Sequence, residues 1–226
     1  MPLNTIRWQT LAGLPTPTIS DALDKLGLPG ALDGPALVTR TGTGVCGPAF
    51  TVGYEEIGAQ SGTVGDFLDD VPSEAVIVID NEGRTDCTVW VAIMTRVARH
   101  RGIAATVING ACRDTAEATT IAYPIWARGT FMRTGKDRVR LAGVNVPVTI
   151  GSVVIQPGDI VCADADCVVV VPADRATEVA EIARRIDDIE NCVIASVLAG
   201  TTLAQARSLH GYHTLQTPAG DDSPTP

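Results

Sequence analysis

An arginine followed directly by an aspartate, Arg113-Asp114, is the residue pair in this sequence whose chemistry stands out. The run before it, residues 104–108, predicts a buried strand, and a short helix is expected after it. Loops at the carboxyl ends of parallel strands are where open α/β sheets bind ligands. An arginine presents a two-pronged donor to a carboxylate, and an aspartate oxygen suits a hard cation. The pair is therefore a candidate site for a small acid and a metal ion.

The same aspartate has a second, purely structural interpretation. Asp114 and Glu117 have the spacing of a capping box, in which the first side chain accepts a hydrogen bond from the third residue of the helix and the third reaches back. An aspartate engaged in that cap would be a poor ligand at the same time. The residues alone leave both interpretations open.

Glu190 is the second carboxylate of interest, because of its place on a predicted helix. Apolar residues that step by three or four positions predict a long amphipathic helix over residues 174–198. Glu190 falls about 40° from Ile186, at the edge of the apolar stripe. An ion pair with an arginine is one interpretation of this position. A carboxylate that reaches into a subunit interface is the other.

For other polar and sulfur-containing residues, the sequence favours a structural role over a catalytic or metal-binding one. Asp164 and Asp166 lie in a tight turn between β-branched runs, where aspartates usually bind their own backbone, so we favour a turn over a metal pair. Cys112 adjoins Arg113, but no histidine is near it in sequence, so a Cys/His nucleophile is not favoured. The six cysteines show no C-x2-C spacing and are expected to be reduced thiols, most of them buried.

The surrounding patterns predict a mixed α/β domain. A helix is expected over residues 16–26, capped by Thr18 or Ser20, and strands are expected over 45–53 and 75–80. A helix over 87–100, between the strands 75–80 and 104–108, completes a βαβ unit and hence a parallel part of the sheet. Residues 146–172 predict strands joined by tight turns.

Composition narrows the class of protein. The 226 residues are 45% hydrophobic, which is enough for a full core, and the net charge is −9. A duplex nucleic-acid binder normally has the opposite sign of charge, and no apolar run reaches the roughly 18 residues of a membrane span. We therefore expect a cytoplasmic protein that binds neither nucleic acid nor membrane. One domain is expected over residues 1–216, with a flexible loop at 58–65 and a disordered tail at 217–226.

Several motifs occur together and in order. They are TISDAL at 18–23, GPAFTV at 47–52, VINGACRD at 107–114, ARGT at 127–130, PGDIV at 157–161, ADAD at 163–166 and VVVVP at 168–172. In these motifs the chain resembles the RraA-like family, which includes the regulator of ribonuclease activity and class II pyruvate aldolases such as 4-hydroxy-4-methyl-2-oxoglutarate aldolase. The resemblance implies an α/β/β/α sandwich with a mixed sheet, of the swivelling β/β/α type, assembled as a homotrimer or homohexamer.

The resemblance also implies site residues. Arg113 would contact the carboxylate and carbonyl of a small oxo-acid, and Asp114 would hold Mg²⁺ or Mn²⁺. Glu190 matches a glutamate of the neighbouring subunit that supports a metal-bound water. Ile93 and Met94, at the helix start that the aldolases use, are expected to contact the substrate.

One position departs from the aldolase pattern. The aldolases carry an acidic residue twenty-one positions before the arginine, where this chain has Ala92. Loss of one carboxylate weakens the hold on a hydrated Mg²⁺ ion. Asp80, Glu82 and Asp86 are the nearby carboxylates that would have to substitute for it.

Three functions follow as hypotheses. The first is a lyase on a small oxo-acid, by retro-aldol cleavage or β-decarboxylation, in which Arg113 and a divalent metal stabilise an enolate. The second is a metal-independent enzyme of the same fold that acts on another carbonyl or acid. The third is a non-catalytic trimer whose acidic surface binds another protein.

Overall fold

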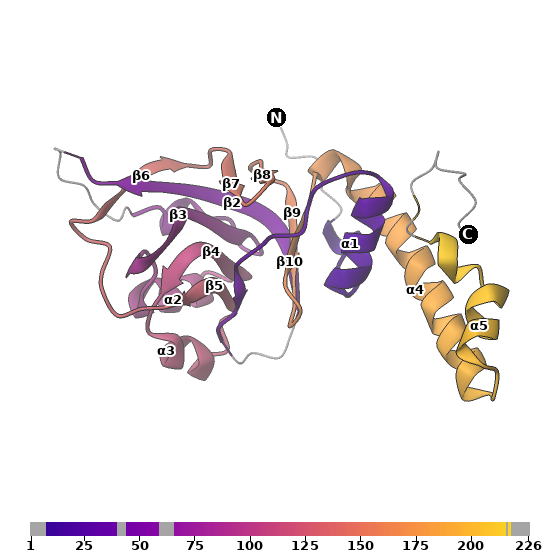
Figure 1. Cartoon of the computed structure of the whole chain (residues 1–226). Coiled ribbons are helices and arrows are strands. Elements are labelled where there is room, and N and C mark those ends of the chain that lie inside the picture. The colour runs from indigo at the N-terminus through magenta and orange to yellow at the C-terminus, as the bar shows by residue number, and fades with distance from the viewer. Residues whose placement is uncertain (1–7, 40–43, 59–65, 216, 218–226) are drawn as a thin grey trace.

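Four parallel strands form the centre of the molecule (Figure 1). They are β2 (Val45–Glu56), β3 (Val76–Thr88), β4 (Ala105–Cys112) and β5 (Ile125–Thr130). This computed structural model describes residues 8–39, 44–58, 66–215 and 217. All eight residues of β4 are buried, as expected of a strand covered on both faces. The predicted βαβ unit is confirmed, because β3 and β4 are parallel neighbours joined by a helix.

Antiparallel strands extend this sheet on both sides. β1 (Ala36–Leu37) pairs with β5, and β6 (Val139–Val144) pairs with the second half of β2. The first residues of β2 pair with β9 (Ile160–Ala163), which pairs with β10 (Val168–Val171). β7 (Val148–Ile150) and β8 (Val153–Ile155) form a separate hairpin. The strands and tight turns predicted over residues 146–172 are therefore confirmed.

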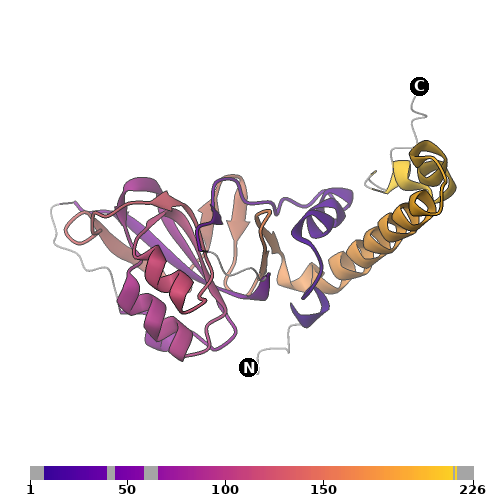
Figure 2. The same cartoon turned by 90° about the horizontal axis from the view of Figure 1, so that it is seen from below.

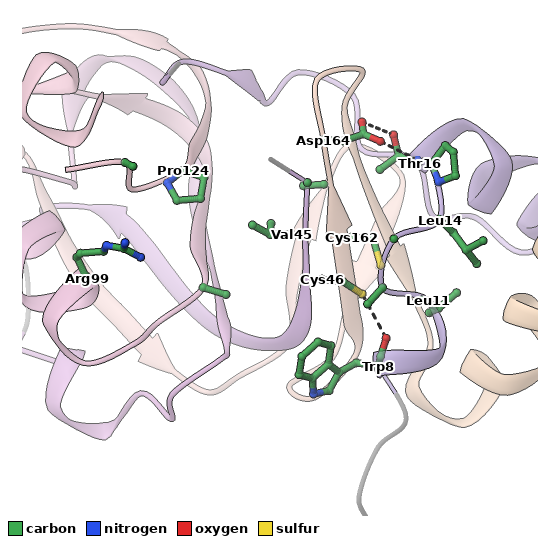
Figure 3. A pocket seen from close by; sticks show the side chains of 17 residues that line it. Trp8, Leu11, Leu14, Thr16, Val45, Cys46, Arg99, Pro124, Cys162 and Asp164 are labelled. Atoms are coloured by element: carbon green, nitrogen blue, oxygen red, sulfur yellow. Dashed lines mark hydrogen bonds between the residues drawn. The ribbon is translucent and has the colours of Figure 1, made fainter. Parts of the chain in front are cut away.

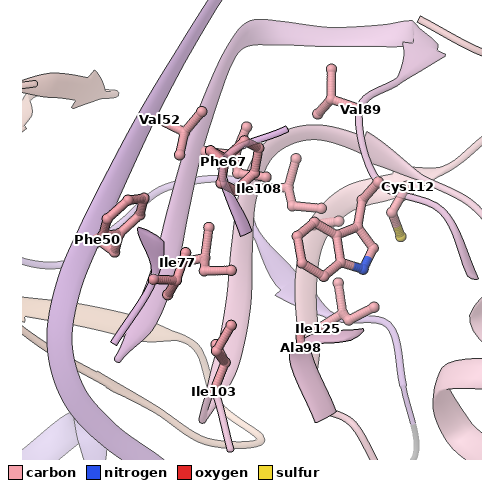
Figure 4. Packing of buried hydrophobic residues seen from close by; sticks show 14 of the residues in the cluster. Phe50, Val52, Phe67, Ile77, Val89, Ala98, Ile103, Ile108, Cys112 and Ile125 are labelled. Atoms are coloured by element: carbon pink, nitrogen blue, oxygen red, sulfur yellow. The ribbon is translucent and has the colours of Figure 1, made fainter. Parts of the chain in front are cut away.

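Three apolar clusters bind four layers together. On one face of the parallel strands lie α2 (Ala92–His100) and α3 (Thr115–Thr120), and Figure 4 shows the apolar packing beneath them. On the other face lie the β7–β8 hairpin and the inner side of β9 and β10. The outer side of β9 and β10 packs against α1 (Thr16–Lys25) and α4 (Ala176–Leu198). Figures 1 and 2 show this order of layers, which confirms the predicted α/β/β/α sandwich with a mixed sheet.

Short helices complete the described chain. Single 3₁₀ turns occur at η1 (Trp8–Thr10), η2 (Leu68–Asp70), η3 (Ala173–Arg175) and η4 (Tyr212–Thr214). A helix that the sequence patterns did not predict, α5 (Leu203–Leu209), follows α4 and is capped by Thr202. Of the loop expected at 58–65 and the tail expected at 217–226, only residues 58 and 217 lie in the described part.

Two local predictions were wrong. The helix predicted over 87–100 begins only at Ala92, because β3 continues through Thr88. Neither Thr18 nor Ser20 caps α1: both lie inside it, and its N-cap position is Pro15, which has no side-chain donor or acceptor. The first N–H group of α1, that of Thr16, instead donates to Asp164 at 2.9 Å.

Candidate active site

Asp114 stands at the junction of β4 and α3 in an uncommon backbone conformation. Its φ of 59° and ψ of 31° are left-handed, a region that costs an L-residue about 1–2 kcal/mol. This conformation turns its carboxylate toward the start of α2, where Oδ2 accepts a hydrogen bond of 2.9 Å from the backbone N–H of Ala92. Asp114 makes no side-chain cap bond to α3. Glu117 pairs with Arg96 at 2.7 Å, so the capping-box interpretation is wrong.

The side chain of Arg113 lies beside Asp114, and a hydrogen bond fixes one end of its guanidinium group. Nη1 donates to the carbonyl oxygen of Met132 at 3.2 Å, and Nε lies 3.6 Å from Oδ2 of Asp114. That separation makes an ion pair but not a hydrogen bond. Nε is buried and has no hydrogen-bond partner in the described part of the chain. A buried donor without a hydrogen bond costs about 1–3 kcal/mol, and the nearby charge of Asp114 offsets part of this cost.

A cavity of about 400 Å³ opens beside this pair. Its walls come from two segments, Arg113, Asp114 and Thr115 after β4, and Thr130, Phe131 and Met132 at the end of β5. The parallel register that sets Cys112 opposite Thr130 brings the two segments together. The β5 residues were not among the predicted site residues. The signal that would have found them is strand order, since the next parallel strand ends beside the same loop.

Ile93 and Met94, predicted to contact the substrate, lie in the first turn of α2. They follow Ala92, whose N–H holds Asp114, but neither lines the cavity. Ile93 is 74% exposed, whereas Met94 packs partly against the core. Their role in binding stays a prediction.

Glu190 lies on α4, at the opposite end of the molecule from α3 (Figures 1 and 2). One chain therefore does not bring Glu190 and Arg113 together. The carboxyl is partly buried and faces two other acids. Burial first, and then repulsion by Asp21 of α1 and Asp187, raise the pKa of Glu190 above its ordinary value of 4.5. A raised pKa suits a group that exchanges protons nearer to neutral pH.

The residues assigned structural roles from sequence behave accordingly. Oδ1 of Asp164 accepts from the backbone N–H of Asp166 at 2.9 Å and from the hydroxyl of Thr16 at 2.6 Å. The turn interpretation of Asp164 is thereby confirmed. Cys112 is fully buried, and burial raises the pKa of its thiol to about 12, so it is no thiolate nucleophile at neutral pH.

The family profile described as Aldolase/RraA matches residues 16–170, which include the β4–α3 loop. The chain belongs to the RraA-like family. The protein DlpA of Legionella pneumophila is 38% identical over 90% of this chain, but the chain spans only 34% of that relative's length. A protein of Halalkalibacterium halodurans, named "Putative 4-hydroxy-4-methyl-2-oxoglutarate aldolase", is 35% identical over 76% of this chain and 79% of its own length.

Solved structures agree with membership of the RraA-like family. An uncharacterized protein of Pseudomonas syringae pv. tomato superimposes with a TM-score of 0.84 at 41% identity, over 92% of this chain and 99% of that one. RraAS2 of Streptomyces coelicolor, an unusual member of the RNase ES inhibitor RraA family, does so with a TM-score of 0.75 at 28% identity, over 84% of this chain and 96% of that one. Within the described residues no helix has the length and apolarity to cross a membrane.

The acidic groups near Arg113 limit how an RraA-like chain can hold a metal ion here. Among the described residues, no group of three or more His, Cys, Asp or Glu side chains is arranged to bind a metal. Asp80 accepts from Asn109 at 2.7 Å, and Asp86 pairs with Arg84 at 3.3 Å. Oδ1 of Asp114 has no partner in that part of the chain. A single free carboxylate oxygen fits a hydrated Mg²⁺ that keeps most of its waters, but not a tightly held ion.

Proposed function

We propose that this chain is an aldolase-type lyase that breaks a carbon–carbon bond in a small oxo-acid. The observation that carries the proposal is the Arg113–Asp114 ion pair at a 400 Å³ cavity that both residues line, with the carboxylate of Asp114 half-exposed. The name of the Halalkalibacterium relative supports the reaction class. Retro-aldol cleavage and β-decarboxylation both leave the enolate of pyruvate, so one site can stabilise the product of either reaction.

Arg113 binds and orients the substrate in this proposal. Its contact with the carbonyl oxygen of Met132 fixes Nη1, and Nε faces Asp114, which leaves the Nη2 donors for an oxo-acid carboxylate or enolate oxygen. Positive charge placed in advance next to a developing oxyanion lowers the barrier without reorganisation. The ion pair with Asp114 holds the guanidinium plane in place.

Asp114 is the residue that would hold a divalent cation through Oδ1, while Oδ2 stays on the N–H of Ala92. Bound there, Mg²⁺ or Mn²⁺ supplies Lewis-acid stabilisation of negative charge on the substrate oxygens. With one protein ligand, affinity for the ion is low, and we expect activity to be lost in EDTA and regained only with excess Mg²⁺.

The proton required at the third carbon of the enolate would come through Glu190 of a second copy. In retro-aldol cleavage the hydroxyl on carbon 4 would pass its proton to the Glu190 carboxylate, and carbon 4 becomes a carbonyl as its bond to carbon 3 breaks. The electron pair of that bond forms the enolate, which then takes the proton back at carbon 3. The raised pKa of Glu190 allows its carboxyl to be protonated more often than an ordinary glutamate. Its place on α4, away from its own Arg113, is the reason that a second copy is required.

The test is pyruvate release from oxaloacetate and from 4-hydroxy-4-methyl-2-oxoglutarate, with Mg²⁺ and after EDTA. Arg113→Ala is expected to lower kcat about 10²–10³-fold, as removal of one oxyanion donor does. Asp114→Asn is expected to lower activity strongly but leave stability nearly unchanged, because asparagine tolerates the left-handed conformation and still accepts from Ala92. Asp114→Ala also loses stability.

Arg101→Ala serves as the matched control. Arg101 ends α2 and pairs with Asp69, which is 88% exposed, so this variant should keep normal turnover. Normal turnover in both Arg113→Ala and Asp114→Asn would contradict the proposal. Turnover that survives exhaustive chelation but not Arg113→Ala would favour the metal-independent enzyme, which Ala92 supports. No turnover by the wild-type chain would leave the protein-binding regulator, as the RNase ES inhibitor family suggests.

A further inference from the structure

Two cysteines far apart in the sequence face each other across strands β2 and β9. Cys46 and Cys162 are direct partners in the antiparallel register. Partners in such a ladder point to the same face of the sheet, with Cα atoms about 4.5–5.5 Å apart. A disulfide requires Cα atoms about 4.4–6.8 Å apart, so the backbone is already in range. All six cysteines lie in the described part of the chain, and no other two are register partners.

The position of this pair in the ladder brings the side chains closest together. Pro48 has no N–H, so the Pro48/Ile160 pair is not a hydrogen-bonded pair, and hydrogen-bonded pairs alternate along an antiparallel ladder. Cys46/Cys162 lies two positions away and is therefore also a non-hydrogen-bonded pair. In such pairs the Cα separation is near the lower limit, about 4.5 Å, and the side chains approach most closely.

The pair is accessible from one side. A cavity of about 690 Å³ is lined by both cysteines together with Trp8, Leu11 and Leu14 (Figure 3). Cys46 is partly exposed, and its thiol donates to the carbonyl oxygen of Trp8 at 3.6 Å. Cys162 is only 3% exposed. Its hydrogen bond with Cys46, and then its burial, raise the pKa of the Cys162 thiol.

We propose that Cys46 and Cys162 form a reversible disulfide with a small oxidised disulfide of the glutathione type as the oxidant. The Cys46 thiolate attacks one sulfur of the oxidant and releases one thiol, which leaves a mixed disulfide on Cys46. As the Cys162 sulfur attacks Sγ of Cys46, its proton passes to the departing thiolate, which leaves as the second thiol. Two protein thiols are oxidised and one disulfide is reduced to two thiols.

This site is separate from the chemistry at Arg113. The cysteines lie where β2 passes from the parallel strands to β9, and they pack toward α1 and α4 rather than toward α3. The bond would tie β2 to β9 and close a loop of more than one hundred residues. It would also remove the thiol hydrogen that Cys46 donates to the segment at Trp8.

The test treats the reduced full-length chain with oxidised glutathione and follows intact mass and non-reducing peptide maps. The expected product has lost two hydrogen atoms, carries no glutathione, links the peptide of Cys46 to that of Cys162, and returns to the starting mass with dithiothreitol. Cys46→Ser and Cys162→Ser should each abolish the link. Cys192→Ser, which changes an exposed cysteine on α4, should leave it intact.

Other outcomes would overturn the proposal. A stable glutathione adduct on Cys46 without ring closure shows that Cys162 does not attack, and an unmodified pair shows that Cys46 is not reached. Circular dichroism and thermal melts of each reduced serine variant confirm that it is folded. Intact mass and peptide maps need no turnover, so failure of the lyase proposal leaves this test unaffected, and where the wild type shows lyase activity, reduced Cys46→Ser should keep it.

Discussion

At the scale of single residues, the backbone position of a carboxylate decides what it does. Asp114 and Asp164 both follow strands and both accept backbone hydrogen bonds, yet only Asp114 keeps one oxygen free beside a cavity. Both oxygens of Asp164 are occupied by Thr16. Glu190 is a third case. Its carboxylate is partly buried and lies near other acids, so its ionisation is unfavourable.

Replacement of Glu190 by glutamine should raise stability at neutral pH. The folded-state pKa of Glu190 lies above 4.5, so the wild-type chain loses stability as pH rises from about 4.5 through that raised value. Glutamine carries no charge to be repelled by Asp21 and Asp187. We expect Tm to increase by about 2 °C at pH 7 and to match the wild type below about pH 4.

Thermal melts of Glu190→Gln from pH 4 to pH 8 check this expectation, and the exposed Asp188→Asn on the same helix is the control. A difference in Tm between wild type and Glu190→Gln that stays the same from pH 4 to pH 8 would contradict it. If Glu190 also transfers the proton, as proposed, lyase activity must fall in the variant while stability rises. Normal activity in Glu190→Gln would remove it from the mechanism.

At the scale of elements, carboxylates from distant parts of the chain accept the hydrogen bonds that the first N–H groups of two helices cannot make within the helix. α1 begins after Pro15 without a side-chain cap of its own, and Asp164 from the β9–β10 turn accepts its first N–H. The first N–H of α2 is bonded in the same way, because the N–H of Ala92 donates to Asp114 from the β4–α3 loop. Each helix is thereby fixed to the sheet as well as to the core beneath it.

Asp164→Ala should destabilise the chain by about 2 kcal/mol, because loss of a helix cap typically costs that order of free energy and the β9–β10 turn is weakened as well. Burial alone would raise the pKa of Asp164, but hydrogen bonds from Thr16, Asp166 and Cys167 outweigh it and hold the pKa below 3.8. The contribution of this carboxylate is therefore present above pH 3.8 and is lost as pH falls through the lowered value.

Urea unfolding at pH 7 and at pH 3 measures this difference. The exposed Asp166→Ala is the control and should change the free energy of unfolding by less than about 0.5 kcal/mol. Equal effects of the two substitutions at pH 7 would show that the contact between Asp164 and α1 contributes nothing.

At the scale of the whole molecule, the arm formed by α4 and α5 extends from the body (Figure 2). It carries large apolar side chains in contact with solvent, Ile194 at 55%, Leu198 at 83%, Leu203 at 48% and Leu209 at 72% exposure. Large apolar side chains gathered at a surface mark an interaction site. We expect a second copy to cover them, within the homotrimer or homohexamer that the family resemblance implies.

Leu198→Glu should therefore shift the assembly toward single chains. A charge placed in a buried apolar contact is costly, whereas the same substitution on a solvent-exposed arm is nearly neutral. Native mass spectrometry of wild type and variant gives the readout, with Val154→Glu, at an exposed site on β8, as the control. A wild-type chain that is monomeric would contradict the assembly and also the proposed role of Glu190 from a second copy.

Local patterns determined the order of elements in this protein. The βαβ unit, the turn-linked strands of residues 146–172 and the long amphipathic α4 all follow from periodicities and turn residues that lie within a few positions of one another. The same reasoning placed Arg113-Asp114 in a loop after a strand. The family followed from motifs spread along the chain, and the matching profile confirms it.

Tertiary structure alone decided the partner of each polar and reactive group. The N–H of Ala92 holds Asp114, the carbonyl of Met132 holds Arg113, and Asp164 caps a helix 148 positions away. Cys46 meets Cys162 only because β2 and β9 pair in one particular register. These contacts join residues distant in the chain, and strand order and register bring them together. No local periodicity encodes that adjacency, because it arises only when the layers pack.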